Sequence, residues 1–429
     1  MSESATVAVL DDAPPLRTSQ NIARLTFYFG LVYFCQGVSQ YVCLLNQPIR
    51  GYLRRELNYN PEQIGNFFFL IGLPWLMKPL YGLISDFIPL LGYRRKSYLL
   101  LLNVLAACAF MYIAARVQPA HVLIGLFLTG VAVAASDVIV DAVMVETGQE
   151  TGRVRLFQGV QWLCINVAAI GSGLLSMWII ARWNPTDALR IAAVIAGLLP
   201  LLVAAMTFWA VRESRAKLNL PQLKSSAAGL LAAFTSPRLW AVAGFLALSR
   251  FNPGLQTPMY DHIIKRVGVD ESFNSLVDTA SAVGMTIASA FFLFVMTGRF
   301  TTRVAIAIGL LTLAAGTAPY FFIHGKTSAM VASFTFGFGY MMAALATLTL
   351  AAEACPKRAE GFVFAALMSI NNLSMNYSDK LGSMLYEKHL AHDINPLIAL
   401  SIGCTLLGLL ILPFLPTTPA EEKAALSPG

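Results

Sequence analysis

Two carboxylates lie one helical turn apart within a long apolar stretch of the chain. Asp137 and Asp141 stand four residues apart in the run 120–147, so a helix places both on one face. An ionised side chain at this depth in a bilayer costs several kcal/mol unless it has a partner or water. Two neighbouring carboxylates in such a site favour the binding of a proton. We therefore predict a proton-coupling role for both; a structural ion pair between Lys78 and Asp141 is the open alternative.

A permanent cation occupies the middle of another predicted helix, 238–262. Arg250 shares a helical face with Thr257 and Asp261, which follow it by 7 and 11 residues. A guanidinium at this depth suits a carboxylate or phosphate of a bound solute, because it can donate two parallel hydrogen bonds to such groups. We predict that Arg250 binds substrate. The alternative is a salt bridge to a neighbouring helix, with Asp278 as the partner.

Amide and hydroxyl side chains form a polar stripe along the predicted helix 359–386. They follow one another at steps of 3, 4, 3 and 4 residues, as Ser369, Asn372, Asn376, Asp379 and Ser383. In lipid such a stripe must face protein or water, which predicts a wet central cavity. The predicted substrate contacts are Arg250, Lys380, Gln40, Asn372, Asn376 and Gln161. Alternatively, these amides form hydrogen bonds between helices that only stabilise the packing.

The composition identifies the medium in which these side chains act. The chain has 429 residues, of which 57% are hydrophobic and 12% are charged, whereas a soluble domain has about 25% charged residues. Such a chain needs the bilayer as its solvent. The net charge of +7 fits an excess of cations in the loops on one side of a membrane. We therefore expect the lipid bilayer, and not nucleic acid, as a partner.

Several classes of chemistry lack their residues in this sequence. The six cysteines form no CxxC pair, and no Cys/His cluster has metal-ligand spacing, so neither a metal nor a cofactor is expected. No Gly-rich phosphate loop indicates ATP as an energy source, and no Ser/His/Asp set stands out. The first twenty residues lack the basic start and apolar centre of a signal peptide. We predict that the protein is not an enzyme.

Twelve apolar stretches are long enough to span a bilayer, which requires about 20 residues. They cover residues 22–47, 61–86, 96–116, 120–147, 155–181, 187–211, 238–262, 273–297, 302–323, 328–353, 359–386 and 395–415. The predicted domains are a tail at 1–21, an N-terminal six-helix bundle at 22–212, a linker at 213–237, a C-terminal six-helix bundle at 238–416 and a tail at 417–429. More Lys and Arg residues fall on the side of both termini, which predicts a cell-membrane protein with both termini in the cytoplasm.

A tight cationic turn separates two of these spans. The stretch 74–96, PWLMKPLYGLISDFIPLLGYRRK, resembles the loop between the second and third helices of major facilitator transporters. Its fuller pattern is similar to the folate–biopterin transporter family of that superfamily, including the six-residue gap between Asp86 and Gly92, which is longer than in most facilitators. The segments SDVIVDAVMVE and LFQGVQWLC at 136–146 and 156–164 also resemble this family, although muropeptide permeases share a DIVxDA run. The second half of the chain matches only in general layout.

The resemblance implies a fold, a cargo and a gate. The fold is the all-α major facilitator fold, and the cargo is a pterin- or folate-like organic anion that moves together with protons. The gate consists of ion pairs near the cytoplasmic ends of the helices, which hold one transport state and break as the halves rock. Its predicted members are Lys78, Asp86, Arg94, Arg95, Glu146 and Glu353.

Together these patterns predict a secondary active transporter that works by alternating access. Two alternatives remain open. One is a transporter of another metabolite, either nucleoside-like or a muropeptide. The other is a non-transporting membrane assembly factor on the same fold. A continuous polar cleft that reaches the level of Arg250 and Asp137 would favour a transporter over an assembly factor.

Overall fold

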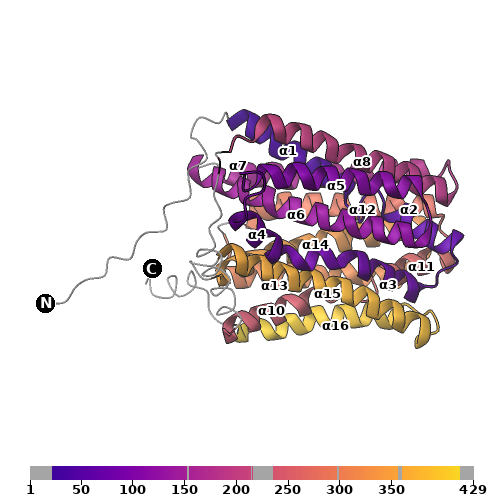
Figure 1. The fold of residues 1–429 in the computed structure, drawn as a ribbon. Coiled ribbons are helices and arrows are strands. Elements are labelled where there is room, and N and C mark those ends of the chain that lie inside the picture. Colours follow the sequence, from indigo (N-terminus) through magenta and orange to yellow (C-terminus); the bar gives the residue numbers. More distant parts are fainter. Residues whose placement is uncertain are drawn as a thin grey trace, which may run out of the picture.

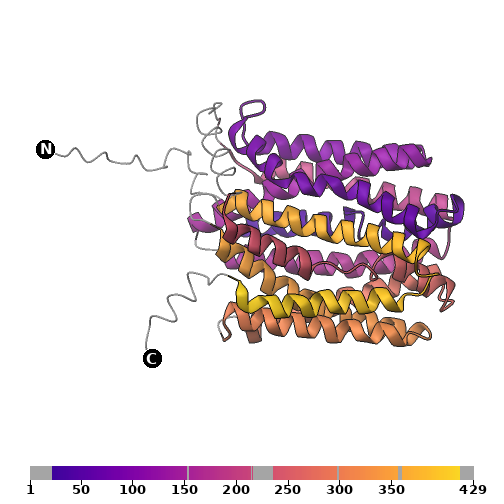
Figure 2. The ribbon, with the colours of Figure 1, turned by 90° about the horizontal axis from the view of Figure 1, so that it is seen from below.

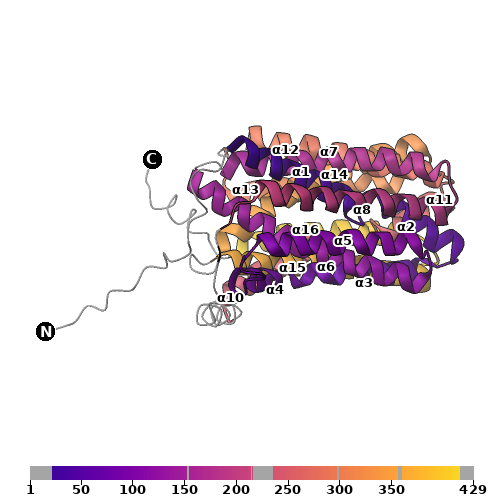
Figure 3. The same cartoon turned by 45° about the horizontal axis from the view of Figure 1, so that its top comes forward.

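The protein is built from helices that run side by side along one direction, as a computed structural model shows (Figures 1, 2 and 3). The structure describes residues 22–151, 154–213, 215, 235–296, 299–355 and 360–415. In this part of the chain an isolated bridge between Leu90 and Tyr93 is the only β-type pairing. Helices suit a bilayer because their backbone hydrogen bonds are satisfied within each segment.

Each of the twelve predicted spans contains helix. The first half comprises α1 (Ile22–Ser39), α2 (Asn46–Gly51), the π-helical η1 (Tyr52–Glu56), α3 (Pro61–Gly72), the 3₁₀-helical η2 (Leu73–Met77), α4 (Lys78–Phe87), α5 (Lys96–Ala115), α6 (Pro119–Thr151), α7 (Val154–Ile180) and α8 (Pro185–Ala210). The second half comprises α10 (Pro237–Ser249), α11 (Thr257–Lys265), α12 (Glu271–Phe291), η3 (Phe292–Met296), α13 (Thr302–Thr317), η4 (Ala318–Phe322), α14 (Lys326–Ala354), α15 (Glu360–Lys388), α16 (Asn395–Ile411) and η5 (Leu412–Phe414).

Nine helical segments of the described residues are long and apolar enough to cross a membrane by length and composition. The other three predicted spans depart from that pattern for visible reasons. The first is interrupted after α1, the seventh is divided into α10 and α11, and α15 carries the polar stripe. Irregular or polar segments are tolerated at membrane depth where they face protein or a cavity.

The molecule has two ends, which we call the terminal and the distal face. α1 begins and α16 ends at the terminal face, on the left of Figure 1, whereas α3, α8 and α16 begin at the distal face, on the right. Side-chain caps fix two of these distal helix starts. Asn60 accepts a hydrogen bond from the Gln63 N–H at 2.9 Å, and Asn184 accepts one from the Asp187 N–H at 2.8 Å. Such caps satisfy N–H groups that have no partner within the helix.

Each half has its own buried apolar cores, and several elements pack across the boundary between the halves. Residues between Leu25 and Val211 form the buried clusters of the first half, and residues between Leu239 and Leu415 form those of the second. Across the boundary, α7 packs against α12, while α3, η2 and α4 pack against α15. Figures 1 and 3 show α3 and α15 side by side. This arrangement confirms the predicted fold of two bundles.

The predicted continuous helix 238–262 is wrong. α10 ends at Ser249 and α11 begins at Thr257, with a non-helical break at 250–256 between them. The break contains Pro253, which has no N–H for the helical ladder, and Gly254, which weakens a helix further. The shared helical face that the spacing of Arg250, Thr257 and Asp261 predicted is therefore not formed.

Candidate substrate and coupling site

A buried ion pair joins α4 and α6 within the first half. Lys78 Nζ lies 2.8 Å from Asp137 Oδ2, and also 4.7 Å from the centre of the Trp75 ring. The alternative pairing of Lys78 with Asp141 is not formed, because the lysine binds the carboxylate one turn earlier. A turn of helix rises about 5.4 Å, which the flexible lysine stem can span. The positions of these residues in the sequence therefore could not show which of the two carboxylates Lys78 binds.

Asp141 is held by neutral donors from two other helices. The Tyr33 hydroxyl of α1 and the Gln161 amide of α7 both donate to Asp141 Oδ1, the latter at 3.0 Å. Gln161, predicted to contact substrate, thus orients this carboxylate. Tyr33 was missed by the sequence reasoning, although it lies three residues before Gln36 on the polar side of α1. A carboxylate with neutral hydrogen-bond partners is suited to take up and release a proton.

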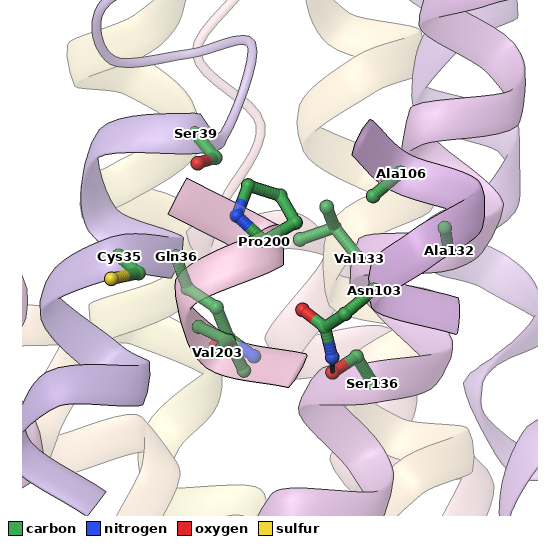
Figure 4. Close-up of a pocket in the computed structure, with 10 residues that line it drawn as sticks. All are labelled: Cys35, Gln36, Ser39, Asn103, Ala106, Ala132, Val133, Ser136, Pro200 and Val203. Atoms are coloured by element: carbon green, nitrogen blue, oxygen red, sulfur yellow. Dashed lines mark hydrogen bonds between the residues drawn. The ribbon is translucent and has the colours of Figure 1, made fainter. Parts of the chain in front are cut away.

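A small cavity lies inside the first half, between α1, α5, α6 and α8 (Figure 4). Gln36 is buried on one side of it, and neither its amide nitrogen nor its amide oxygen has a hydrogen-bond partner. On the other side, Asn103 Nδ2 donates to Ser136 Oγ at 3.2 Å. The cavity has room for about one water molecule. It cannot hold a pterin ring, so the predicted central substrate cavity is a different space and stays a prediction.

The second half holds two cations against aromatic rings. Arg250 is 6% exposed, its guanidinium carbon lies 4.7 Å from the centre of the Tyr340 ring, and its Nη1 has no hydrogen-bond partner. Lys380 Nζ lies 4.6 Å from the centre of the Phe69 ring of the first half. Neither cation forms an ion pair with another described residue. The alternative salt bridge from Arg250 to Asp278 is not formed.

The predicted amides occupy three different settings. Asn376 of α15 packs directly on Gly72, where any Cβ atom would overlap its amide group. Asn372 is partly exposed on the same helix. Gln40 lies in the turn between α1 and α2, where its backbone N–H donates a hydrogen bond to the Gln36 carbonyl oxygen at 3.0 Å. The polar stripe of α15 therefore contributes both to packing between the halves and to accessible polar surface.

The predicted gate residues at the terminal face form contacts within one half. Asp86 Oδ1 lies 3.0 Å from Arg95 Nη2 and 3.8 Å from Arg94 Nη2. The turn between these residues contains Gly92, whose φ of +83° lies in the left-handed region. Glu213, which the sequence reasoning placed at the start of the linker, accepts the backbone N–H groups of Arg94, Arg95 and Lys96 at 2.9–3.2 Å. A carboxylate at the start of α5 stabilises the helix.

The other predicted gate residues are not brought to this cluster. Glu353 accepts a hydrogen bond from the Thr302 hydroxyl at 2.9 Å within the second half. Lys78 binds Asp137, well inside the first half. The Glu146 side chain lies outside the described residues, as do both tails and most of the linker. The gating role of this set stays a prediction.

A second set of contacts, missed by the sequence reasoning, joins the halves at the distal face. Arg54 and Arg55 lie 3.0 and 3.5 Å from Glu271, and Lys388 lies 2.7 Å from Glu62. The sequence pattern that could have predicted these pairs is a group of arginines at 50–55, together with carboxylates at the starts of later helices. These three ion pairs close the distal face of this conformer.

Polar side chains continue this closure inward. Asn46 and Gln47 of α2 donate to Asp278 Oδ2 of α12 at 3.2 and 2.7 Å. Arg50 of α2 donates from Nη1 to Thr257 Oγ1 at 2.8 Å. Each of these bonds crosses from one half to the other, so separating the halves at this face requires all of them to break.

Comparisons with known proteins agree on the family and the fold. The model of the BT1 family matches residues 36–425. A folate-biopterin transporter of Synechocystis sp. is 28% identical over 415 residues, which cover 91% of this chain and 81% of that protein. A probable folate-biopterin transporter 4 of Arabidopsis thaliana is 28% identical over 166 residues, 37% of this chain and 33% of that protein.

Solved structures of transporters share the architecture. The D-xylose–proton symporter superposes with a TM-score of 0.71 at 14% identity, and the match covers 92% of this chain and 98% of that one. The nucleoside transporter NupG superposes with a TM-score of 0.69 at 11% identity, with the same coverage. At this identity the likeness shows the fold alone. Family and fold together support a multi-pass membrane transporter for a small molecule.

Proposed function

This chain belongs to the BT1 family, and we propose that it moves a pterin- or folate-like organic anion across the membrane by proton-coupled alternating access. The cargo follows the name of its Synechocystis relative, a folate-biopterin transporter. Such transport is secondary and active, and it requires no enzymatic step. In this proposal the terminal face, where α1 begins and α16 ends, is the cytoplasmic side.

The proposal rests mainly on Arg250, which has an N–H donor without a hydrogen-bond partner. Its guanidinium is 6% exposed and stacked on Tyr340, yet Nη1 has no hydrogen-bond partner. A buried cation without an anion is costly, and a carboxylate of the cargo would satisfy it with charge-assisted hydrogen bonds. Tyr340 and Phe69, which already flank the two cations, also provide faces on which a heteroaromatic ring can stack.

Proton coupling belongs to the first half in this proposal. Asp137 is paired with Lys78, whose Nζ lies 2.8 Å away, whereas Asp141 has only the neutral donors Tyr33 and Gln161 among its described hydrogen-bond partners. Asp141 is therefore the group that takes up the proton. Protonation changes its hydrogen bonds to α1 and α7, and α7 also packs against α12 of the other half.

Alternating access follows from the closure at one face. The three ion pairs from Arg54, Arg55 and Lys388 hold the distal ends of the two halves together. In the proposed cycle they break when the halves rock about the contacts of α7 with α12 and of α3 with α15. The two six-helix bundles, 22–212 and 238–416, each move as a unit in this cycle.

The deciding experiment is uptake of labelled folate and biopterin by vesicles that contain the purified protein, with and without a pH gradient. We expect uptake that rises with the gradient and that falls about 100-fold in Arg250→Gln. Arg182→Gln is the matched control, because Arg182 is an exposed cation stacked on Trp178 at 4.7 Å. Absence of uptake with the unmodified protein, despite correct folding, would refute the proposed cargo.

A thermal-shift screen separates the remaining candidates. Stabilisation by pterins and folates, and not by nucleosides or muropeptides, is the expected result. Stabilisation by one of the other classes would reassign the cargo. A protein that binds none of the four classes and transports none of them would be better described as a non-transporting membrane protein on the transporter fold.

A further inference from the structure

The break between α10 and α11 is held at both ends by a single face of α15. The Asn252 N–H donates to Ser378 Oγ at 3.3 Å, near the start of the break. At its end, the Thr257 N–H and hydroxyl donate to the two carboxylate oxygens of Asp379, both at 2.8 Å. Between these points, Gly382 lies so close to the Pro253 carbonyl that any Cβ atom would overlap it.

Asp379 fixes where α11 begins. Its carboxylate binds the first N–H of that helix, where a negative charge is favourable because of the helix dipole. Arg250 lies at the opposite end of the same break, directly after the last residue of α10. The position of the Arg250 side chain therefore depends on how the break is held.

Arg50 of the first half contacts Thr257, the first residue of α11. Arg50 is 4% exposed, donates to Thr257 Oγ1 at 2.8 Å and lies 4.4 Å from the centre of the Phe68 ring. The Thr257 hydroxyl thus accepts from Arg50 while it donates to Asp379, which makes a continuous chain of hydrogen bonds across the boundary. Removal of Arg50 leaves Thr257 and Asp379 bonded to each other but removes the hydrogen bond that links them to α2 of the first half.

We propose that the chain Arg50–Thr257–Asp379 couples closure of the distal face to the position of Arg250, with Asp379 and Thr257 as positioning residues. When the distal face opens, Arg50 leaves Thr257, the break relaxes against α15, and Arg250 moves relative to the site where the cargo binds. The consequence for cargo binding rests on the proposed function. The mechanical link itself does not.

Cysteine labelling tests the link without any substrate. In one background Cys43, in the turn before α2, is the only cysteine, and it reports opening of the distal face. In a second background without native cysteines, Arg250→Cys reports the position of the break. A small charged methanethiosulfonate is the probe in both. We expect Thr257→Val to change both labelling rates about fivefold or more, because it removes the shared hydroxyl.

Matched variants separate the link from a general loss of structure. Thr257→Ser keeps the hydroxyl and should label like the parent protein at both positions. Asp379→Asn keeps the shape but not the charge, and should change both rates in the same direction as Thr257→Val. It also decides the outcome if Thr257→Val fails to fold. A change at position 43 with none at position 250, or no change at either position, would overturn the proposal.

Transport then tests the consequence for the cargo. Thr257→Val should raise the KM for folate uptake more than it lowers the maximal rate, since Arg250 is displaced and the proton site of the first half is untouched. Thr257→Ser should restore the KM. If the unmodified protein carries no folate, the proposed cargo fails while the labelling experiment still decides the link. An unchanged KM alongside altered labelling would contradict the role of Thr257 in positioning Arg250.

Discussion

In the first half, the intramembrane carboxylates have partners from their own half. Lys78 binds Asp137, and Tyr33 and Gln161 bind Asp141. In the second half, Arg250 and Lys380 lie against aromatic rings and form no ion pair with a described residue. The difference teaches that the two halves of one fold perform different tasks. In the proposed function, the first half exchanges a proton and the second half binds the anionic cargo.

The largest effect should come from the cation of the second half. Arg250→Gln removes a buried permanent charge, and charge-assisted hydrogen bonds to a carboxylate are worth roughly 1.5–3 kcal/mol each. Uptake of labelled folate should fall about 100-fold, and Arg250→Lys should recover part of it. Equal uptake by Arg250→Gln and the control Arg182→Gln would remove the basis of the comparison.

The second test compares the two carboxylates of the first half. Asp137→Asn leaves Lys78 buried without its partner, which should lower the free energy of unfolding by about 3 kcal/mol. Asp141→Asn leaves the Lys78 pair intact, so it should fold normally and lose stimulation by a pH gradient, while exchange of labelled for unlabelled cargo continues. Proton-driven uptake that survives in Asp141→Asn would disprove its assignment.

A double variant sharpens the same contrast. Removing both members of the pair with Lys78→Met and Asp137→Asn leaves neither partner buried as an unpaired charge, so stability should return to within about 1 kcal/mol of the parent protein. Thermal unfolding of the four members of this cycle measures the coupling between the two residues. If the losses of unfolding free energy in the two single variants add up to the loss in the double variant, the contact of 2.8 Å between Lys78 and Asp137 contributes nothing to stability.

A smaller effect is expected at Lys380. Its ammonium group stacks on Phe69 at 4.6 Å and is partly exposed. Lys380→Gln should therefore raise the KM for the anion about tenfold, a smaller loss than at Arg250, because water already compensates part of its charge. The ratio of uptake with and without a pH gradient should not change. A changed ratio would place Lys380 in proton coupling instead.

The smallest effect should come from the cavity within the first half. If a water molecule satisfies the buried amide, Gln36→Leu should lower the free energy of unfolding by about 1 kcal/mol and leave uptake unchanged. Thermal unfolding and uptake assays measure both quantities. Gln36→Glu is a useful contrast, since a new buried charge should destabilise the protein far more. A strong transport defect in Gln36→Leu would connect this cavity to the coupling site.

The sequence predicted the architecture well because hydrophobicity is a local property. Apolar length located each span, and the residues at 74–96 and 136–146 carried the family resemblance that the BT1 match confirms. The Pro253-Gly254 pair signalled the break in the seventh span, but the overall apolar run concealed it. The sequence also identified Asp137, Asp141 and Arg250 as unusual, because any charge in a long apolar run requires an explanation.

What the sequence alone determined, then, is which segments enter the membrane and which residues cannot remain there without a partner. The tertiary structure alone decided the partners. Lys78 lies within reach of two carboxylates one turn apart, and only the packing of α4 on α6 selected Asp137. Arg50 and Asp379 are 329 residues apart in the chain, and Thr257 joins them through contacts that no local pattern encodes. Side-chain pairing depends on distances between elements, and these exist only once the two halves have packed together.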